Sequence, residues 1–178
     1  DEFLAAGGAA VAKARELPDG MEALGVLVVN AAQTEAAVFG PDGAAPRMAK
    51  GGVVISSATM APDAARALAA KADAAGLLYL DAPVSGVAVT ARAGEMTVMG
   101  AGSDAAFATA APVFDAIATK VWRLGSEIGI GATVKVVHQL LAGVHIAAAA
   151  EAMALGIRAG ADPQAQKWRR KRNITASI

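Results

Sequence analysis

Short apolar runs alternate with alanine-rich stretches along most of the chain. The first three runs are rich in Val, Ile and Leu and end in small or polar residues, as strands buried on both faces do. They are GVLVVNA (25–31), GVVISSA (52–58) and GLLYLDAPV (76–84). Between the last two, Pro62 and Asp63 suit the first turn of a helix, and Gly76 suits its C-terminal end. This strand–helix–strand order predicts an α/β fold.

The same alternation continues for another 50 residues or so. We expect a strand over 95–102, a helix over 103–118 with Ser103 as its N-cap, and a short strand over 120–125. From about 131 to 160 the pattern changes to one long helical stretch. The chain therefore predicts part of a Rossmann-like doubly wound sheet, followed by the first long helix of an all-α domain.

A dinucleotide-binding domain of this type begins with a strand, a G-x-G-x-x-G turn and a helix. No such turn occurs in the sequence, so the first two strands are expected to lie before residue 1. Their loss would expose an edge in the middle of the sheet, and the chain alone is expected to be poorly stable or to aggregate. We divide it into a partial dinucleotide-binding domain (1–125), an interdomain helix (126–162) and a divergent basic tail (163–178).

Composition narrows the classes of site. Without cysteine the chain has no disulfide, thiolate zinc site or cysteine nucleophile. The part through Gln166 holds 11 basic and 16 acidic residues, whereas KWRRKR (167–172) adds five basic ones. Such a run can bind nucleic acid or serve as a localisation signal, but a solvated chain end is the simpler interpretation. The N-terminus lacks the pattern of a signal peptide, and the long helix looks too polar for a membrane span, so we expect a cytoplasmic protein.

Polar residues follow each of the first three predicted strands. In open α/β sheets, ligands bind beyond the carboxyl ends of the strands. The alternative for each residue alone is a helix cap or a turn. The candidates are Asn30 and Gln33, then Ser56, Ser57 and Thr59, then Asp81, Ser85 and Gly86.

Three segments resemble the β-hydroxyacid dehydrogenases, the family related to 3-hydroxyisobutyrate dehydrogenase. DAPVSGVAVTARAGEMTVMGAG (81–102) is similar to its D-x-P-x-S-G-G…G-x-L/M-T-x-M-x-G-G segment, and ISSATMAP (55–62) to the segment that brings a Thr to the nicotinamide. GIGATVKVVHQLLAGVHIAAAAEAMALGIRAG (129–160) resembles its G-x-G-x-x-x-K catalytic helix. The amino-acid sequence of that helix resembles the corresponding helix in the branch of the family that oxidises four-carbon sugar acids such as L-threonate.

The resemblance implies NAD- or NADP-dependent oxidation of a hydroxy acid to a 2-oxo acid without a metal. It implies that Lys135 is the catalytic general acid and base. The implied substrate-binding residues are Ser85, Gly86, His138 and Gln139; the implied cofactor-binding residues are Asn30, Ala31 and Thr59. The expected partner is a small hydroxy acid, with no nucleic acid or membrane, and the full-length protein is expected to form a homo-oligomer. Alternatives are a 2-hydroxy-3-oxopropionate (tartronate semialdehyde) reductase, a 3-hydroxyisobutyrate dehydrogenase, or a non-catalytic fragment.

The spacing on the helix agrees with this chemistry. His138 and Gln139 follow Lys135 at i+3 and i+4 and share one helix face with it. A lysine partly desolvated by Ala and Val has a lowered pKa and can exchange a proton with a hydroxyl group. From the residues alone, a surface lysine with its stem on apolar surface is the favoured interpretation of Lys135, and the family motif around it reverses that preference. Val87 replaces the second Gly of the S-G-G loop, and we expect its side chain to resist unusual backbone angles and to crowd the substrate carboxylate.

Overall fold

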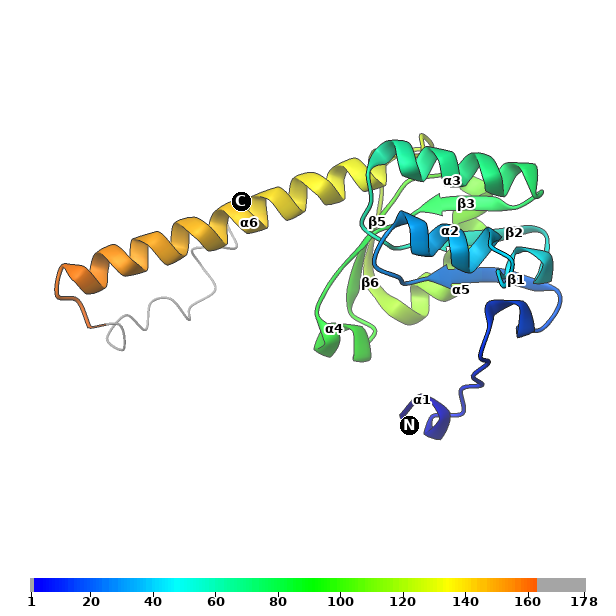
Figure 1. The fold of residues 1–178 in the computed structure, drawn as a ribbon, viewed down its shortest axis with the longest axis horizontal. Coiled ribbons are helices and arrows are strands. Elements are labelled where there is room, and N and C mark those ends of the chain that lie inside the picture. The colour runs from blue at the N-terminus through cyan, green and yellow to red at the C-terminus, as the bar shows by residue number, and fades with distance from the viewer. Residues whose placement is uncertain (1, 163–178) are drawn as a thin grey trace. The chain divides into compact units, whose positions relative to one another are not determined.

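A computed structural model describes residues 2–162 of the 178-residue chain. Packing divides the chain into two compact units, residues 1–137 and 138–178. The elements in chain order (Figure 1) are α1 (Glu2–Ala5), η1 (Ala14–Glu16), β1 (Met21–Val26), α2 (Ala31–Phe39), η2 (Ala45–Arg47), β2 (Met48–Ser56), α3 (Pro62–Ala74), β3 (Leu78–Asp81), β4 (Val84–Ser85), α4 (Ala88–Arg92), β5 (Met96–Gly100), α5 (Asp104–Ile117), β6 (Ala118–Arg123) and α6 (Ile130–Arg158).

The first unit contains a parallel sheet in the order β1-β2-β3. Val26 pairs with Ser56, and Ser56 pairs with Asp81, so the last residues of the three strands form one row. The segments that follow these strands therefore all leave from the same edge of the sheet. The polar residues that the sequence places after the strands lie on these segments.

Side chains of this sheet alternate between two cores. Val54 and Tyr79 point to the face covered by α2 and α3, where Leu68 packs against them. Ile55 and Leu80 point to the opposite face, where α5 contacts all three strands. Figure 1 shows these helices on both sides of the sheet. Because both faces are covered, the strands read as continuous apolar runs.

A second sheet has the order β4-β5-β6. β4 is antiparallel to β5, and β5 is parallel to β6. An antiparallel bridge between Asp81 and Ala101 links the two sheets. The predicted Rossmann-like class is confirmed, with one antiparallel strand pair that the sequence did not indicate.

Several element boundaries differ from the sequence-based expectation. β1 ends at Val26 instead of 31, and the unpredicted helix α2 begins at Ala31. The run 76–84 is two strands and not one, because Pro83 has no N–H to donate to a sheet ladder. Ser103 does cap α5, accepting a hydrogen bond from the N–H of Ala106 at 3.2 Å.

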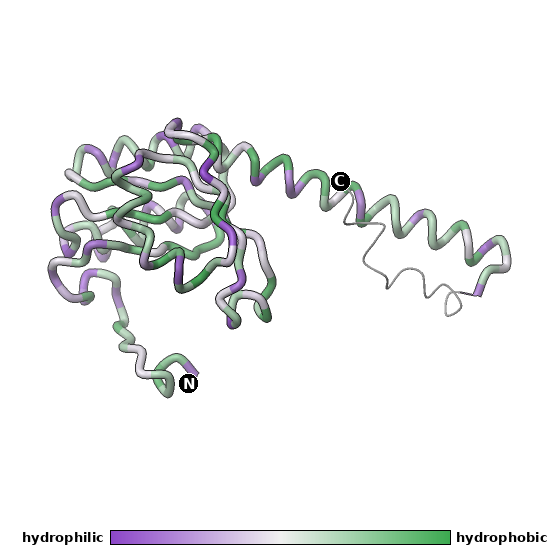
Figure 2. Tube along the Cα trace, turned by 180° about the vertical axis from the view of Figure 1, so that it is seen from behind, coloured by the Kyte–Doolittle hydropathy of each residue, from purple (hydrophilic) through white to green (hydrophobic). Residues whose placement is uncertain are grey.

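The long helix is present as α6, Ile130–Arg158, 29 residues. Its length and the mean hydropathy of 1.8 over an 18-residue window also meet the criteria for a membrane span, which core helices of globular proteins can meet as well. Figure 2 shows mostly hydrophobic positions along it, with hydrophilic ones between. Polarity alone therefore does not exclude a span, contrary to our sequence argument. The basic run 167–172 lies outside the described residues.

Within the described part of the chain, β1 lies at the edge of its sheet and pairs only with β2. Leu27 and Val29, which follow it, are 62% and 76% exposed. An open edge beside exposed apolar side chains favours association with other chains. This supports the expectation that the chain alone aggregates, which stays a prediction.

Candidate active site

Asp81 is a buried carboxylate at the end of β3, and only 2% of its surface is exposed. Its Oδ2 accepts hydrogen bonds from the backbone N–H groups of Gly129, at 3.0 Å, and Ala132, at 2.8 Å. These amides belong to the start of α6, where unpaired N–H groups and the helix dipole favour a negative group. Burial raises the pKa of Asp81, and the hydrogen bonds oppose that rise. Asp81 therefore caps a helix whose preceding residue, Gly129, lies 48 residues later in the chain.

The two glycines at this helix start have different structural reasons. Gly129 has a φ of +99°, a conformation that side chains disfavour. Gly131 has no room for a side chain: a Cβ there would lie 2.5 Å from the carbonyl oxygen of Asp81 and 2.8 Å from that of Met99. The G-x-G spacing thus lets the helix dock directly on the backbone where the two sheets meet.

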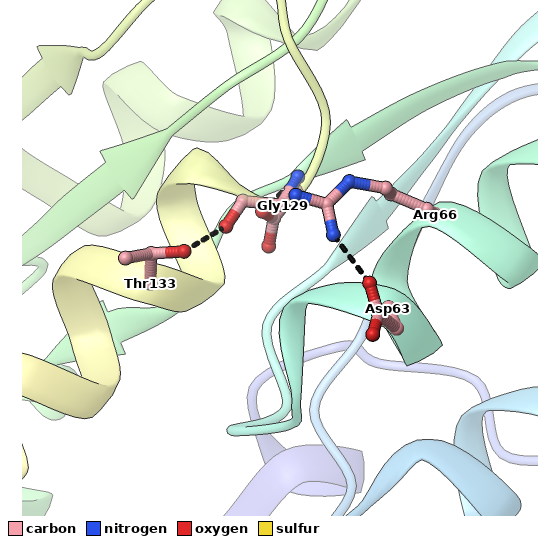
Figure 3. A network of polar contacts seen from close by, with 5 residues as sticks. Asp63, Arg66, Gly129 and Thr133 are labelled. Atoms are coloured by element: carbon pink, nitrogen blue, oxygen red, sulfur yellow. Dashed lines mark hydrogen bonds and ion pairs between the residues drawn. The ribbon is translucent and has the colours of Figure 1, made fainter.

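Arg66 of α3 lies beside the same turn, as Figure 3 shows. Its Nη1 is 2.6 Å from Oδ1 of Asp63, and its guanidinium lies next to Gly129. The positive charge of Arg66 also opposes the rise in the pKa of Asp81. On the helix itself, the hydroxyl of Thr133 donates to the carbonyl oxygen of Gly129 at 2.7 Å. The first turn of α6 is therefore held by hydrogen bonds to Asp81 of β3 and within its own residues, with the guanidinium of Arg66 beside it.

Lys135 lies on the buried side of this helix start. It follows the buried Ala132 by three residues, and only 8% of its own surface is exposed. Burial lowers its pKa. Among the described residues it forms no ion pair or hydrogen bond. Buried cations are ordinarily paired, so an unpaired lysine here is a candidate for proton transfer.

The loop after β4 carries Ser85 and Gly86. Ser85 pairs with Thr97 of β5, and Gly86 has a φ of +154°. Val87 has ordinary extended angles, φ −109° and ψ 171°, and the residue is 68% exposed. The expectation that Val87 resists its backbone conformation is therefore wrong, because the position does not need glycine angles.

The backbone N–H of Val87 already has a partner. It donates to Oγ1 of Thr90 at 2.9 Å, and this hydroxyl donates to the carbonyl oxygen of Val87 at 2.8 Å. In this structure the Val87 amide is therefore not free to receive a substrate carboxylate. The side chain of Ser85 has no hydrogen bond among the described residues.

Of the residues implied to bind cofactor, Asn30 serves as the N-cap of α2. Its Oδ1 accepts from the N–H of Gln33 at 2.9 Å, and Gln33 Oε1 accepts from the N–H of Val29 at 2.9 Å. Ala31 is the first residue of the helix. Thr59 is exposed after β2 and has no hydrogen bond within the described residues. The cap explains Asn30 and Gln33 structurally, whereas Thr59 is free to contact a ligand.

His138 and Gln139 belong to the second unit. Both are exposed, and His138 Nδ1 lies 3.3 Å from Gln139 Oε1. Their predicted roles in substrate binding stay predictions.

Sequence reasoning noted Asp81 only as one polar residue at a strand end and did not identify it as the anchor of α6. A signal was present, since Asp81 closes the apolar run GLLYL and a carboxylate there must be buried. Buried charges need hydrogen-bond donors. Arg66, on an exposed helix face, carried no comparable signal.

Comparisons with known proteins show to which protein family the chain belongs. Residues 1–125 match the family described as the NAD binding domain of 6-phosphogluconate dehydrogenase. Residues 129–166 match the family described as the NAD-binding of NADP-dependent 3-hydroxyisobutyrate dehydrogenase. The chain thus belongs to the β-hydroxyacid dehydrogenase family, whose NAD(P)-binding fold it shares.

Individual proteins of known name show which members of the family the chain is similar to. The chain is 54% identical to L-threonate dehydrogenase of Cupriavidus necator over 163 residues, covering 92% of this chain and 55% of the relative. It is 31% identical to 2-hydroxy-3-oxopropionate reductase of Escherichia coli, covering 92% of this chain and 56% of the relative. A crystal structure described as 3-hydroxyisobutyrate dehydrogenase from Salmonella typhimurium has a TM-score of 0.83 and 53% identity, covering 90% of this chain and 56% of that one. The chain spans about half the length of the curated relatives it matches.

Proposed function

We propose that this chain forms part of an NAD(P)-dependent dehydrogenase that oxidises a four-carbon sugar acid such as L-threonate at C2, giving the 2-oxo acid. The observation that carries the proposal is Lys135, an unpaired and nearly buried lysine in the first turns of α6. Its surroundings match what general acid–base chemistry needs, and relatives at 52% and 54% identity carry the name L-threonate dehydrogenase.

In this proposal the neutral Nζ of Lys135 takes the proton of the substrate C2 hydroxyl group while the C2–H leaves as hydride. The lowered pKa of Lys135 makes the neutral form more available than for an exposed lysine. After the transfer the ammonium stabilises negative charge on the same oxygen, and it returns the proton in the reverse direction. Acid–base help of this kind contributes about 10²–10⁴ in rate.

The bound nicotinamide supplies the hydride acceptor. The residues here suit the nicotinamide end of such a cofactor, since the exposed hydroxyl of Thr59 has no other partner in the described part of the chain. Asn30 and Ala31 are proposed to line that end from the start of α2. A G-x-G-x-x-G turn for the pyrophosphate does not occur in this sequence.

The substrate carboxylate is proposed to bind at Ser85 and Gly86, whose loop leaves the sheet four residues after Asp81. His138 and Gln139 are proposed to bind substrate hydroxyl groups. A homo-oligomer and a cytoplasmic location are proposed for the whole enzyme.

The test uses a chimera, because the chain spans about half of its relatives. This chain replaces the matching 163-residue span of the Cupriavidus necator L-threonate dehydrogenase. Reduction of NAD and of NADP is measured with L-threonate, glycerate and 3-hydroxyisobutyrate. We expect the highest kcat/KM with L-threonate. A higher value with glycerate or 3-hydroxyisobutyrate would assign the chain to the reductase or to the 3-hydroxyisobutyrate enzyme instead.

The role of Lys135 is tested in the same chimera. Lys135→Ala is expected to lower kcat by about 10²–10⁴, and Lys135→Arg by a similar factor because a guanidinium does not release its proton near neutral pH. The matched control is Lys71→Ala, which removes an exposed lysine paired with Glu35 at 2.6 Å. Retention of most activity by Lys135→Ala, or no activity in the unmutated chimera with any of the three acids, would refute the proposal.

A further inference from the structure

One oxygen atom of Asp81 holds the start of α6. Oδ2 accepts from the N–H of Gly129 and from that of Ala132, three residues further along the helix. Two donors on one acceptor fix both the position and the rotation of the first turn. The donors also carry the partial positive charge of a helix N-terminus, which strengthens hydrogen bonds to a carboxylate.

Lys135 stands one turn beyond this anchor. It lies three residues after Ala132, a rise of about 4.5 Å, and both residues are buried on the same side of α6. Over so short a length a helix moves as a rigid rod. A displacement of the first turn therefore moves Lys135 by a similar distance, and a rotation of one residue, about 100°, turns its side chain off the buried face.

The other contacts at this turn do not set the rotation by themselves. Gly131 lies close to the carbonyl oxygens of Asp81 and Met99, which limit how closely the helix approaches but accept no hydrogen bond from α6. Arg66 lies beside Gly129 and pairs with Asp63, whose side chain is 97% exposed. Asp81 is the buried group in the described structure that bonds directionally to this turn.

We propose that Asp81 is a positioning residue for Lys135: its carboxylate fixes the first turn of α6 and thereby places the lysine Nζ where it meets the substrate hydroxyl group. This rests on the proposed function of Lys135. Asp81 itself touches neither substrate nor cofactor. Four residues then act together in placing the lysine, although the aspartate belongs to a different sequence motif. They are Asp81, Gly129, Gly131 and Lys135.

Two charged or titratable side chains face Asp81 among the described residues. Arg66 faces it from α3 and Tyr79 from β3. Burial raises the pKa of Tyr79 to about 12, and a guanidinium keeps its charge, so neither titrates near neutral pH. For Lys135, the described residues provide no ion-pair partner. His138 follows it by three residues, so His138→Gln serves as a control that removes the neighbouring imidazole.

The first experiment uses the full chain at low micromolar concentration. Competitive acetylation with acetic anhydride, followed by peptide mass spectrometry, gives the pH midpoint of Lys135 labelling, with Lys71 and Lys120 as internal references. Hydrogen exchange of peptides covering 126–134 reports the first turn of α6. The variants are Asp81→Ala and Asp81→Asn, and Asp63→Ala is the matched control for loss of a nearby carboxylate.

With Asp81→Ala we expect faster exchange in peptides covering 126–134 and a shift of the Lys135 midpoint toward its ordinary pKa of 10.5, because the lysine leaves its buried position. Asp81→Asn keeps an acceptor oxygen in place and should restore most of both values. Asp63→Ala should leave both unchanged. If Asp81→Ala speeds the exchange but leaves the labelling midpoint of Lys135 unchanged, Asp81 is a structural residue only and the proposal fails.

A second comparison does not depend on the folding of Asp81→Ala. Asp81→Glu keeps the charge but moves the acceptor by one methylene group, whereas Asp81→Asn keeps the position and loses the charge. If Asp81 positions Lys135, the pH midpoint of Lys135 labelling in Asp81→Asn should lie closer to that of the unmutated chain than the midpoint in Asp81→Glu does. The reverse order would overturn the proposal.

Kinetics in the chimera separate this proposal from the proposed function. We expect Asp81→Ala to lower kcat by up to about 100-fold, with a smaller effect on KM, and Asp81→Asn to recover most of the loss. If Lys135→Ala abolishes activity but Asp81→Ala keeps the unmutated kcat, only the positioning role is refuted. If Lys135→Ala remains active, the function of Lys135 is refuted and the positioning role falls with it.

Discussion

The glycine at position 131 offers a sharp test of how α6 is seated. Gly131→Ala adds one methyl group, and its Cβ would lie 2.5 Å from the carbonyl oxygen of Asp81 and 2.8 Å from that of Met99. Both atoms are backbone atoms of the junction between the sheets, so neither can rotate away as a side chain would. The helix start must therefore retreat by roughly 1 Å to reach an ordinary contact distance.

The cost follows from two effects. Overpacking of a tight contact costs about 1–3 kcal/mol. A retreat of this size also stretches the hydrogen bonds from Gly129 and Ala132 to Asp81, now 3.0 and 2.8 Å, and a hydrogen bond to a charged group contributes about 1.5–3 kcal/mol. Alanine recovers at most about 1 kcal/mol of helix propensity. We expect a net loss of about 2–4 kcal/mol in the free energy of unfolding.

The assay is urea unfolding of the full chain at low concentration, followed by far-UV circular dichroism. The matched control is Gly143→Ala, the same change in the same helix, where a Cβ meets nothing within 4 Å. That variant should be unchanged or more stable by up to about 1 kcal/mol. Equal stabilities for the two variants would refute the tight docking of Gly131.

Three further outcomes are expected. In the chimera, the rate of oxidation should rise with pH with a midpoint below 10.5, because burial lowers the pKa of Lys135. Lys135→Arg should remove that midpoint. A midpoint at or above 10.5 would contradict the assignment of the proton transfer to Lys135. Burial raises the pKa of Asp81, so between pH 3.8 and that raised pKa this carboxyl group binds more protons in the folded chain than in the unfolded one. The free energy of unfolding should therefore fall as pH rises through this range. If urea unfolding at a series of pH values gives the same pH dependence for Asp81→Asn, Asp81 is not its source. Ser103→Ala should cost about 1 kcal/mol of unfolding free energy through loss of the α5 cap, and an unchanged midpoint in urea would speak against it.

The alternation of apolar runs was sufficient to predict the strands β2, β3 and β5, because both faces of these strands are covered. It was also sufficient for α3 and α5, whose first turns carry Pro62 and Ser103. It failed for α2, where the apolar residues 25–31 continue smoothly from strand to helix start. Only the cap formed by Asn30 marks that boundary.

For the candidate site, Lys135 could be identified from its motif and its apolar surroundings, although its role remains a prediction. The anchor could not be identified, because Asp81 contacts residues 48 and 51 positions away and no local pattern records such a pair. The expectation for Val87 failed for a similar reason. Its backbone angles depend on Thr90, whose hydroxyl group closes the turn.

The double hydrogen bond between Val87 and Thr90 couples two positions of the loop that is proposed to bind the substrate carboxylate. An amide that is already satisfied gains little when only its own side chain changes, so Val87→Gly by itself leaves the loop closed. Thr90→Val by itself removes both hydrogen bonds but leaves the branched side chain of Val87 in the loop. Under the proposed role of this loop in substrate binding, the two positions are expected to be epistatic: single-site scans would record each as nearly neutral, whereas the double variant would change which acids the loop admits.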